Sequence, residues 1–162
     1  MVKVRVPATT ANLGSGFDCL GMALSLYLDI KMEKANYGFT FQAEGEGAAM
    51  ISSDKDNLIY RAVHLVMEKA NIDPEKSGIK IAIKNEIPVE RGLGSSASAI
   101  IGGILGASQL YDVNLSREEI LQMAFSLEGH LDNIVPALIG GFTISYKDYQ
   151  GQIRWVKLDV PH

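Results

Sequence analysis

The chain has 162 residues, of which 47% are hydrophobic and 21% are charged, a composition typical of a globular protein with one sizeable core. Its formal net charge of −4 disfavours nucleic acid or an anionic membrane as a partner, and no segment has the apolar length needed to span a bilayer. The single cysteine, Cys19, excludes an intrachain disulfide, and no Cys/His cluster has zinc-site spacing, so we expect a reducing, cytoplasmic setting.

The first third of the chain predicts strands. Apolar and polar residues alternate over Val2–Val6, and Pro7 is expected to end that strand. A glycine-bearing loop leads to a longer strand over residues 24–34, rich in Leu, Tyr and Ile. Residues 39–43 predict a short strand, paired with the preceding one in a hairpin across residues 36–38.

The middle of the chain predicts two helices separated by a strand. Asn57 opens the first helix, whose apolar residues recur at helical spacing up to Ala70. Residues 79–84 alternate as a strand does, and the second helix starts near Ser96 and runs to about Leu110. Because this helix is rich in Gly and Ala, a neighbouring backbone can come close, and we expect the helix to be buried.

The last third predicts two further helices and two strands. Ser116, followed by two glutamates, is typical of a helix N-cap, and this helix should run to about Leu127. A short helix is expected around residues 132–138, then strands over residues 142–146 and 153–158. The irregular order of strands and helices predicts an α+β fold, a two-layer sandwich with helices on one face of a mixed sheet.

The loop at residues 88–98 is a candidate phosphate-binding site. Gly92 and Gly94 permit close backbone approach, and Ser95 and Ser96 begin the following helix, whose N-terminus carries free N–H donors and a partial positive charge. The Lys that ends the P-loop motif is absent. Taken alone, the spacing of the loop favours an ordinary turn with a serine cap.

Two other segments gather polar side chains. Asn12 and Asp18 in the first glycine-rich loop could hold the ammonium and hydroxyl groups of a ligand, or they could close the loop through an Asx-turn network. Glu128, His130 and Asp132 lie close together at a helix junction and could hold Mg²⁺ and a substrate hydroxyl. In the alternative interpretation, Asp132 caps the helix and His130 is a surface residue.

Taken together, the three segments resemble the GHMP kinase superfamily, and within it the homoserine kinases. The order and spacing match in PATTANLGSGFDCLGMAL, PVERGLGSSASA and EGHLDNIVPALIGGF. The resemblance implies a GHMP kinase N-terminal domain, with a ribosomal protein S5 domain 2-like architecture. It also implies ATP-dependent, Mg²⁺-assisted phosphorylation of the hydroxyl of L-homoserine, a step of threonine biosynthesis. The opening segment distinguishes the chain from galactokinases and isoprenoid kinases.

The resemblance also assigns roles to residues of this chain. Asp132 and Asn133 are implied at the catalytic position, with Asp132 a substrate ligand before it is a base. Ser95 and Glu128 are implied as Mg²⁺ ligands. The segments that face homoserine contain Asn12, Asp18, His130 and Asp132. The segments that face the nucleotide contain Asn57, Pro88, Arg91, Gly92, Leu93, Gly94, Ser95, Ser96, Ala97 and Ser98.

The main departure from the family pattern is length, since such kinases carry a second, C-terminal domain. We therefore expect residues 1–162 to be an N-terminal ATP-binding domain that keeps the nucleotide loop but has an incomplete amino-acid pocket. Apolar surface should be exposed where the missing domain would pack, which favours a homodimer or other self-association. The remaining alternatives are another GHMP kinase, such as mevalonate or shikimate kinase, and a non-catalytic nucleotide-binding module.

Overall fold

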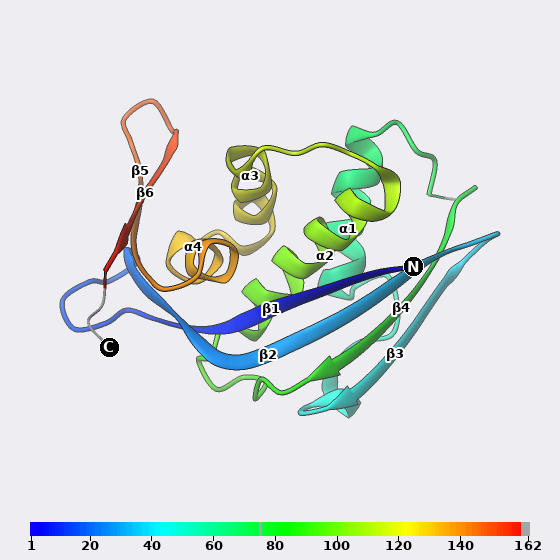
Figure 1. Ribbon diagram of the computed structural model, residues 1–162, viewed down its shortest axis with the longest axis horizontal. Coiled ribbons are helices and arrows are strands. Elements are labelled where there is room, and N and C mark those ends of the chain that lie inside the picture. The colour runs from blue at the N-terminus through cyan, green and yellow to red at the C-terminus, as the bar shows by residue number, and fades with distance from the viewer. Residues whose placement is uncertain (75, 160–162) are drawn as a thin grey trace.

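The fold is described from a computed structural model, which covers residues 1–74 and 76–159. Its strands are β1 (Val2–Ala11), β2 (Leu20–Ala35), β3 (Phe39–Gly45), β4 (Gly78–Asn85), β5 (Phe142–Lys147) and β6 (Ile153–Leu158). Its helices are α1 (Leu58–Lys69), α2 (Ser95–Tyr111), α3 (Arg117–Glu128) and α4 (Leu131–Ile139), with a 3₁₀ turn η1 (Ala48–Met50). Helices lie on one face of a single sheet (Figure 1), so the predicted two-layer α+β sandwich is confirmed.

The strand order corrects one prediction. The sheet runs β3-β4-β2-β5-β6, with β1 also paired to β2. β3 therefore forms no hairpin with β2, and it pairs in parallel with β4 instead. The physical reason is that β4 presents Ile79, Ile81 and Ile83 to the core, so it buries more apolar surface beside the central strand β2 than β3 would.

Strand β1 is longer than predicted. It continues past Pro7 to Ala11, and its register with β2 shifts between Pro7 and Ala8. Proline lacks an N–H for the ladder and is tolerated at such irregularities. Beyond the shift, both Ala8 and Thr9 are fully buried. The irregularity thus brings Thr9, a polar residue, into the interior.

Helix α2 forms the centre of the helical layer, and its burial is confirmed. A Cβ atom at Gly102 would lie 2.4 Å from Ile30 Cδ1, and one at Gly106 would lie 2.6 Å from Met32 Sδ. At Gly103 the nearest atom would be Ala62 Cβ, at 2.7 Å. The glycines therefore let α2 pack closely against both the sheet and α1, which sets the position of the start of α2.

The helix starts differ in how their backbone donors are satisfied. The Asn57 side chain accepts hydrogen bonds from Ile59 N and Tyr60 N at the start of α1, and Ser116 forms a capping box with Glu119 at the start of α3, both as predicted. By contrast, α2 begins after Gly94, with no side-chain cap. In the described part of the chain, no helix is long and apolar enough to cross a membrane.

Candidate functional site

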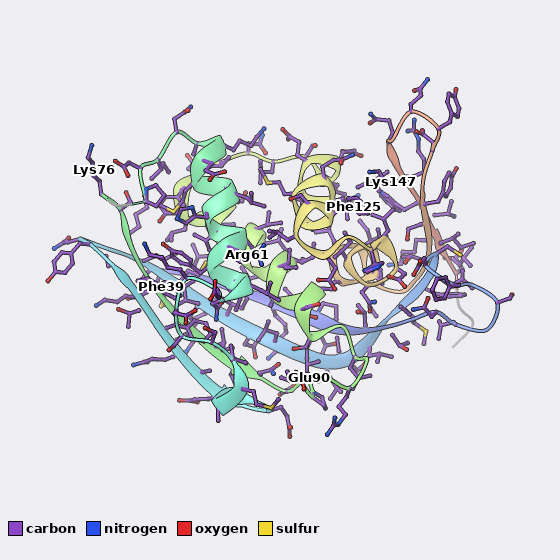
Figure 2. All side chains as sticks on the ribbon, turned by 180° about the vertical axis from the view of Figure 1, so that it is seen from behind. Phe39, Arg61, Lys76, Glu90, Phe125 and Lys147 are labelled. Atoms are coloured by element: carbon purple, nitrogen blue, oxygen red, sulfur yellow. The ribbon has the colours of Figure 1, made fainter. Side chains whose placement is uncertain are left out.

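A cavity of about 650 Å³ opens at the start of α2. This volume is in the range that small-molecule and nucleotide sites occupy. Figure 2 shows Glu90, one of its lining residues, in the loop that leads into α2. The sequence-predicted residues that line the cavity are Asn12, Asn57, Pro88, Arg91, Gly92, Leu93, Gly94, Ser95, Ser96, Glu128 and Asn133. The structure therefore brings the three sequence segments together around one space.

The loop before α2 and the uncapped start of that helix border this cavity. Glu90, Gly92 and Gly94 all have positive φ, of 58°, 69° and 65°, which coils the loop in the left-handed region. Because Gly94 supplies no side chain at the N-cap position, the first N–H groups of α2 have no cap of the kind that Asn57 provides for α1. Free donors at a helix N-terminus that borders a cavity suit an anion such as a phosphate chain.

Glu128 lies beside the start of α2 although it is the last residue of α3. Ser96 Oγ donates a hydrogen bond to Glu128 Oε1 at 2.6 Å, and both residues line the cavity. No group of three or more His, Cys, Asp or Glu side chains that could hold a metal is found in residues 1–74 and 76–159. A hydroxyl and one carboxylate are still a suitable oxygen set for Mg²⁺, which uses one or two carboxylates and keeps its waters and substrate phosphates as other ligands.

Thr9 supports the site without lining its cavity, and the sequence reasoning missed it. Its Oγ1 donates to Asn133 Oδ1 at 2.8 Å, and its N donates to Leu93 O at 3.1 Å. One buried threonine therefore connects β1, the glycine loop and α4. The segment that contains it was recognised, but the expected strand end at Pro7 placed Thr9 in a loop.

Some nucleotide-site candidates have structural partners instead. Asn57 is buried, and besides capping α1 its Nδ2 donates to Ser52 O at 2.6 Å, so the side chain fixes the cavity wall. Ala97 and Ser98 are fully buried and do not line the cavity. Ser98 Oγ donates to Pro7 O at 2.7 Å and to Gly94 O at 3.0 Å. This hydroxyl therefore ties the glycine loop to β1.

The β1–β2 loop is closed by a side-chain hydrogen bond that spans six residues, a longer closure than the two-residue step of an Asx turn. Asp18 N donates to Asn12 Oδ1 at 2.8 Å, and both residues adopt positive φ, of 58° for Asn12 and 55° for Asp18. Both side chains are exposed, and Asn12 lines the cavity whereas Asp18 does not. This closure leaves the Asp18 carboxylate and the Asn12 amide nitrogen available to a ligand.

Asp132 lies buried at the first turn of α4, and it is not the helix cap. The N-cap is His130, which is exposed, while Asp132 is 1% exposed. Burial raises the pKa of the Asp132 carboxyl above its ordinary value, and the charge of Asp18 raises this pKa further. Asn133 Nδ2 lies 3.4 Å from Asp132 Oδ1. A buried carboxylate near a second carboxylate is the kind of group that occurs at functional sites.

We expect Asp132→Asn to stabilise the fold at neutral pH. Since the folded-state pKa of Asp132 is raised, the ionised group destabilises the folded state above that pKa, and protonation relieves the penalty as the pH falls toward the unfolded value near 3.8. The variant should raise the unfolding midpoint at pH 7 by about 2–4 °C, the shift that roughly 1 kcal/mol gives in such a domain. Its advantage should shrink on acidification.

Thermal unfolding monitored by circular dichroism from neutral to acidic pH measures this difference. Asp18→Asn is the matched control, because it removes the second carboxylate but keeps a residue that tolerates positive φ. It should lower the pKa of Asp132. An Asp132→Asn variant less stable than the parent at pH 7 would contradict the claim that the ionised Asp132 carboxylate destabilises the folded state.

A family profile described as "GHMP kinases N terminal domain" matches residues 57–141. The homoserine kinase of Caldanaerobacter subterraneus is 51% identical over 148 residues, covering 91% of this chain and 47% of that enzyme. The homoserine kinase of Petrotoga mobilis is 43% identical over 161 residues, covering 99% of this chain and 52% of that enzyme.

A solved structure is also similar. The crystal structure of homoserine kinase from Cytophaga hutchinsonii matches with a TM-score of 0.83 at 29% identity, over 99% of this chain and 52% of that one. The chain spans about half the length of the curated relatives that it matches.

Proposed function

This chain belongs to the GHMP kinase family, and from that premise we propose that it forms the nucleotide-binding part of an ATP-dependent homoserine kinase. The observation that carries the proposal is the uncapped start of α2, which borders a cavity of about 650 Å³ next to the Ser96–Glu128 pair. The relatives at 43–51% identity support homoserine as the acceptor. In this proposal, residues 1–162 form one domain, and polypeptide equivalent to the rest of those relatives completes the acceptor site.

The residues of this chain act mainly by positioning. The backbone N–H groups of the glycine loop and of the first turn of α2 would hold the phosphate chain. Beside it, the Glu128 carboxylate would hold Mg²⁺ together with the Ser96 hydroxyl, which takes the place expected for Ser95 because it is Ser96 that contacts Glu128. ATP with Mg²⁺ supplies the transferable phosphoryl group and neutralises its charge. Arg91 borders the same cavity and is exposed, so its guanidinium can reach a phosphate from the solvent side.

The acceptor side is built from the β1–β2 loop and the start of α4. Asp18 provides a carboxylate for the ammonium group of an amino acid, and Asn12 and Asn133 provide amides for its hydroxyl. Asp132 orients the acceptor from behind these groups, because its carboxyl is buried and hydrogen-bonded to Asn133. Transfer then depends on holding the hydroxyl in line with the phosphate chain.

The Mg²⁺ assignment predicts a specific loss in Glu128→Gln. The amide oxygen can still accept from Ser96 Oγ, so the fold should be kept, whereas the charge that binds the cation is removed. We expect the gain in ATP affinity caused by Mg²⁺ to fall at least about 10-fold. Calorimetric titrations of ATP with and without Mg²⁺ measure this gain.

Asp56→Asn is the control for that experiment. Asp56 is an acidic residue that lines the same cavity, but it lies beside the start of α1. In the Asp56→Asn variant, the gain in ATP affinity caused by Mg²⁺ should be the same as in the parent. Equal losses in the two variants would mean that general negative charge, and not Glu128, binds the cation.

The proposed activity is tested by joining this chain to the remaining half of the Petrotoga mobilis enzyme and supplying a panel of alcohols with ATP. Phosphate transfer to homoserine in preference to mevalonate or shikimate is the expected result. Transfer to another alcohol, with homoserine unreactive, would refute the proposed substrate while leaving the nucleotide site intact.

A further inference from the structure

The outer face of the sheet, away from the helices, is divided into a charged half and an apolar half. In the charged half, Lys3, Arg5, Lys31 and Lys84 are exposed, and Arg5 Nε forms an ion pair with Asp29 Oδ1 at 2.7 Å. Charged side chains of this kind are normally exposed to solvent, so this half of the sheet needs no covering layer. The other half, formed by the first residues of β2 and by the β5–β6 hairpin, has the opposite character.

The strand pairing defines this apolar sheet face. The side-chain position of Gly21 faces α4, since a Cβ atom there would lie 1.7 Å from Asp132 O. Successive residues of a strand face opposite sides of the sheet, so the side chains of Leu20 and Met22 point away from the helices. Leu20 pairs with Ile144 and Met22 with Phe142, which in turn pair with Val156 and Leu158. We call these six residues the apolar sheet face: Leu20, Met22, Phe142, Ile144, Val156 and Leu158.

The polarity of β5 is the reverse of that in a sheet with one layer of helices, whereas on β6 the apolar residues Ile153 and Trp155 face the core in the ordinary way. On β5 the residues that face the helices are Thr143 and Ser145, both fully buried, and Thr143 Oγ1 donates to Gly21 O at 3.3 Å. The outward residues of β5 are Phe142, Ile144 and Tyr146, and both Tyr146 and its neighbour on the outer side of β6, Val156, are 52% exposed. A half-buried antiparallel strand normally has its apolar side chains inward. The reversal indicates that a second apolar layer covers the outer side.

The apolar sheet face is separate from the core of the described structure. None of its six side chains belongs to the buried cluster or to the partly buried residues packed against that cluster. Figure 1 shows α3 and α4 beside one side of the hairpin, whereas the other side has no described helix or strand beside it and is bordered only by the β1–β2 loop. The hairpin is held from its inner side, where Lys147 Nζ lies 4.2 Å from the centroid of the Phe125 ring, the pair labelled in Figure 2.

We propose that the apolar sheet face docks the polypeptide that corresponds to the second half of the relatives. The lengths of the relatives support this occupant. They match 91–99% of this chain, but the match covers only 47–52% of their own length, so about half of each relative lies outside the matched part. The chemistry of the sheet supports the same occupant, because an apolar patch bordered by charged residues is typical of a surface that another polypeptide covers. The proposal rests on membership of the family and not on the identity of the acceptor.

Thiol labelling tests this proposal without relying on turnover. In a Cys19→Ala background, single cysteines are introduced as Val156→Cys on the apolar sheet face and Lys31→Cys on the charged half. Reaction with a maleimide is timed in the chain alone, at low concentration, and in the chain joined to the remaining half of the Petrotoga mobilis enzyme. We expect V156C to react at least about 10-fold more slowly in the joined protein, while K31C changes less than about 2-fold.

The other outcomes overturn the proposal. Equal V156C rates in both proteins would mean that the face stays open, and equal protection of both cysteines would mean that the face is not selected. Protection of V156C in the chain alone that grows with concentration, with a dimer in sedimentation, would assign the face to a second copy. If the joined protein does not fold, the aligned positions of the whole Petrotoga mobilis enzyme are labelled instead, and fast reaction at the first position refutes the docking.

Discussion

Gly94→Ala should weaken nucleotide binding and destabilise the fold. A Cβ atom at this position would lie 1.9 Å from Thr9 Oγ1 and 3.0 Å from Asn133 Oδ1, two atoms that are themselves hydrogen-bonded at 2.8 Å. Positive φ adds strain of about 1–2 kcal/mol, and overpacking adds about 1–3 kcal/mol. The loop must move, and losing two or three phosphate donors at about 0.5–1.5 kcal/mol each weakens ATP binding by roughly 10–100-fold.

Gly92→Ala separates these two effects. Gly92 has a similar φ of 69°, but a Cβ atom there would meet nothing within 4 Å. It should therefore lose only the conformational part, about 1–2 kcal/mol. Urea unfolding and ATP titration of both variants give the comparison. Similar losses in the two variants would mean that the junction of Thr9, Gly94 and Asn133 does not hold the loop.

Gly21→Ala should strongly destabilise the fold. Its Cβ would lie 1.7 Å from Asp132 O and 3.0 Å from Pro136 Cγ, so a methyl group would push the backbone of α4 away from β2. Because the first of these atoms is backbone, it cannot turn aside as a side chain does. We expect a loss of about 3 kcal/mol or more, at the upper end of overpacking effects.

The same substitution should also impair the acceptor site, because Asp132 and Asn133 lie in the first turn of the displaced helix. Chemical denaturation of the chain measures the stability loss. Gly151→Ala is the comparison, since its Cβ would meet nothing within 4 Å and only its positive φ of 76° opposes the change. A Gly21→Ala variant as stable as Gly151→Ala would contradict the close contact of α4 with β2.

The local sequence predicted most elements but not the partner of every strand. The helix starts at Asn57 and Ser116 were predictable because a side chain and the amide it caps are neighbours in the chain. The pairing of β3 depends on β4, which lies beyond α1 and competes for the same edge of β2 with its buried isoleucines. Such competition is a property of the whole core, so the turn before β3 could not predict it.

In the candidate site, too, the local sequence predicted some residues and missed those whose role depends on distant parts of the chain. The glycine loop and Glu128 were predicted because their residue types are characteristic, and the structure brings both to one cavity. Thr9 was missed because it acts only through an irregularity in β1 that turns it inward toward Asn133. Ser98 was placed with the nucleotide by its position in the motif, yet its hydroxyl bonds to Pro7 O and the residue does not line the cavity.

The central claim is that the loop before α2 holds the phosphates of ATP. An NMR titration of the isotope-labelled chain with ATP and Mg²⁺ tests it most directly. We predict saturable shifts of the amide signals of Gly92, Gly94, Ser95 and Ser96, with Glu128 responding when Mg²⁺ is present. Unchanged loop signals at saturating ATP, or shifts confined to the charged sheet surface around Arg5 and Lys84, would contradict it.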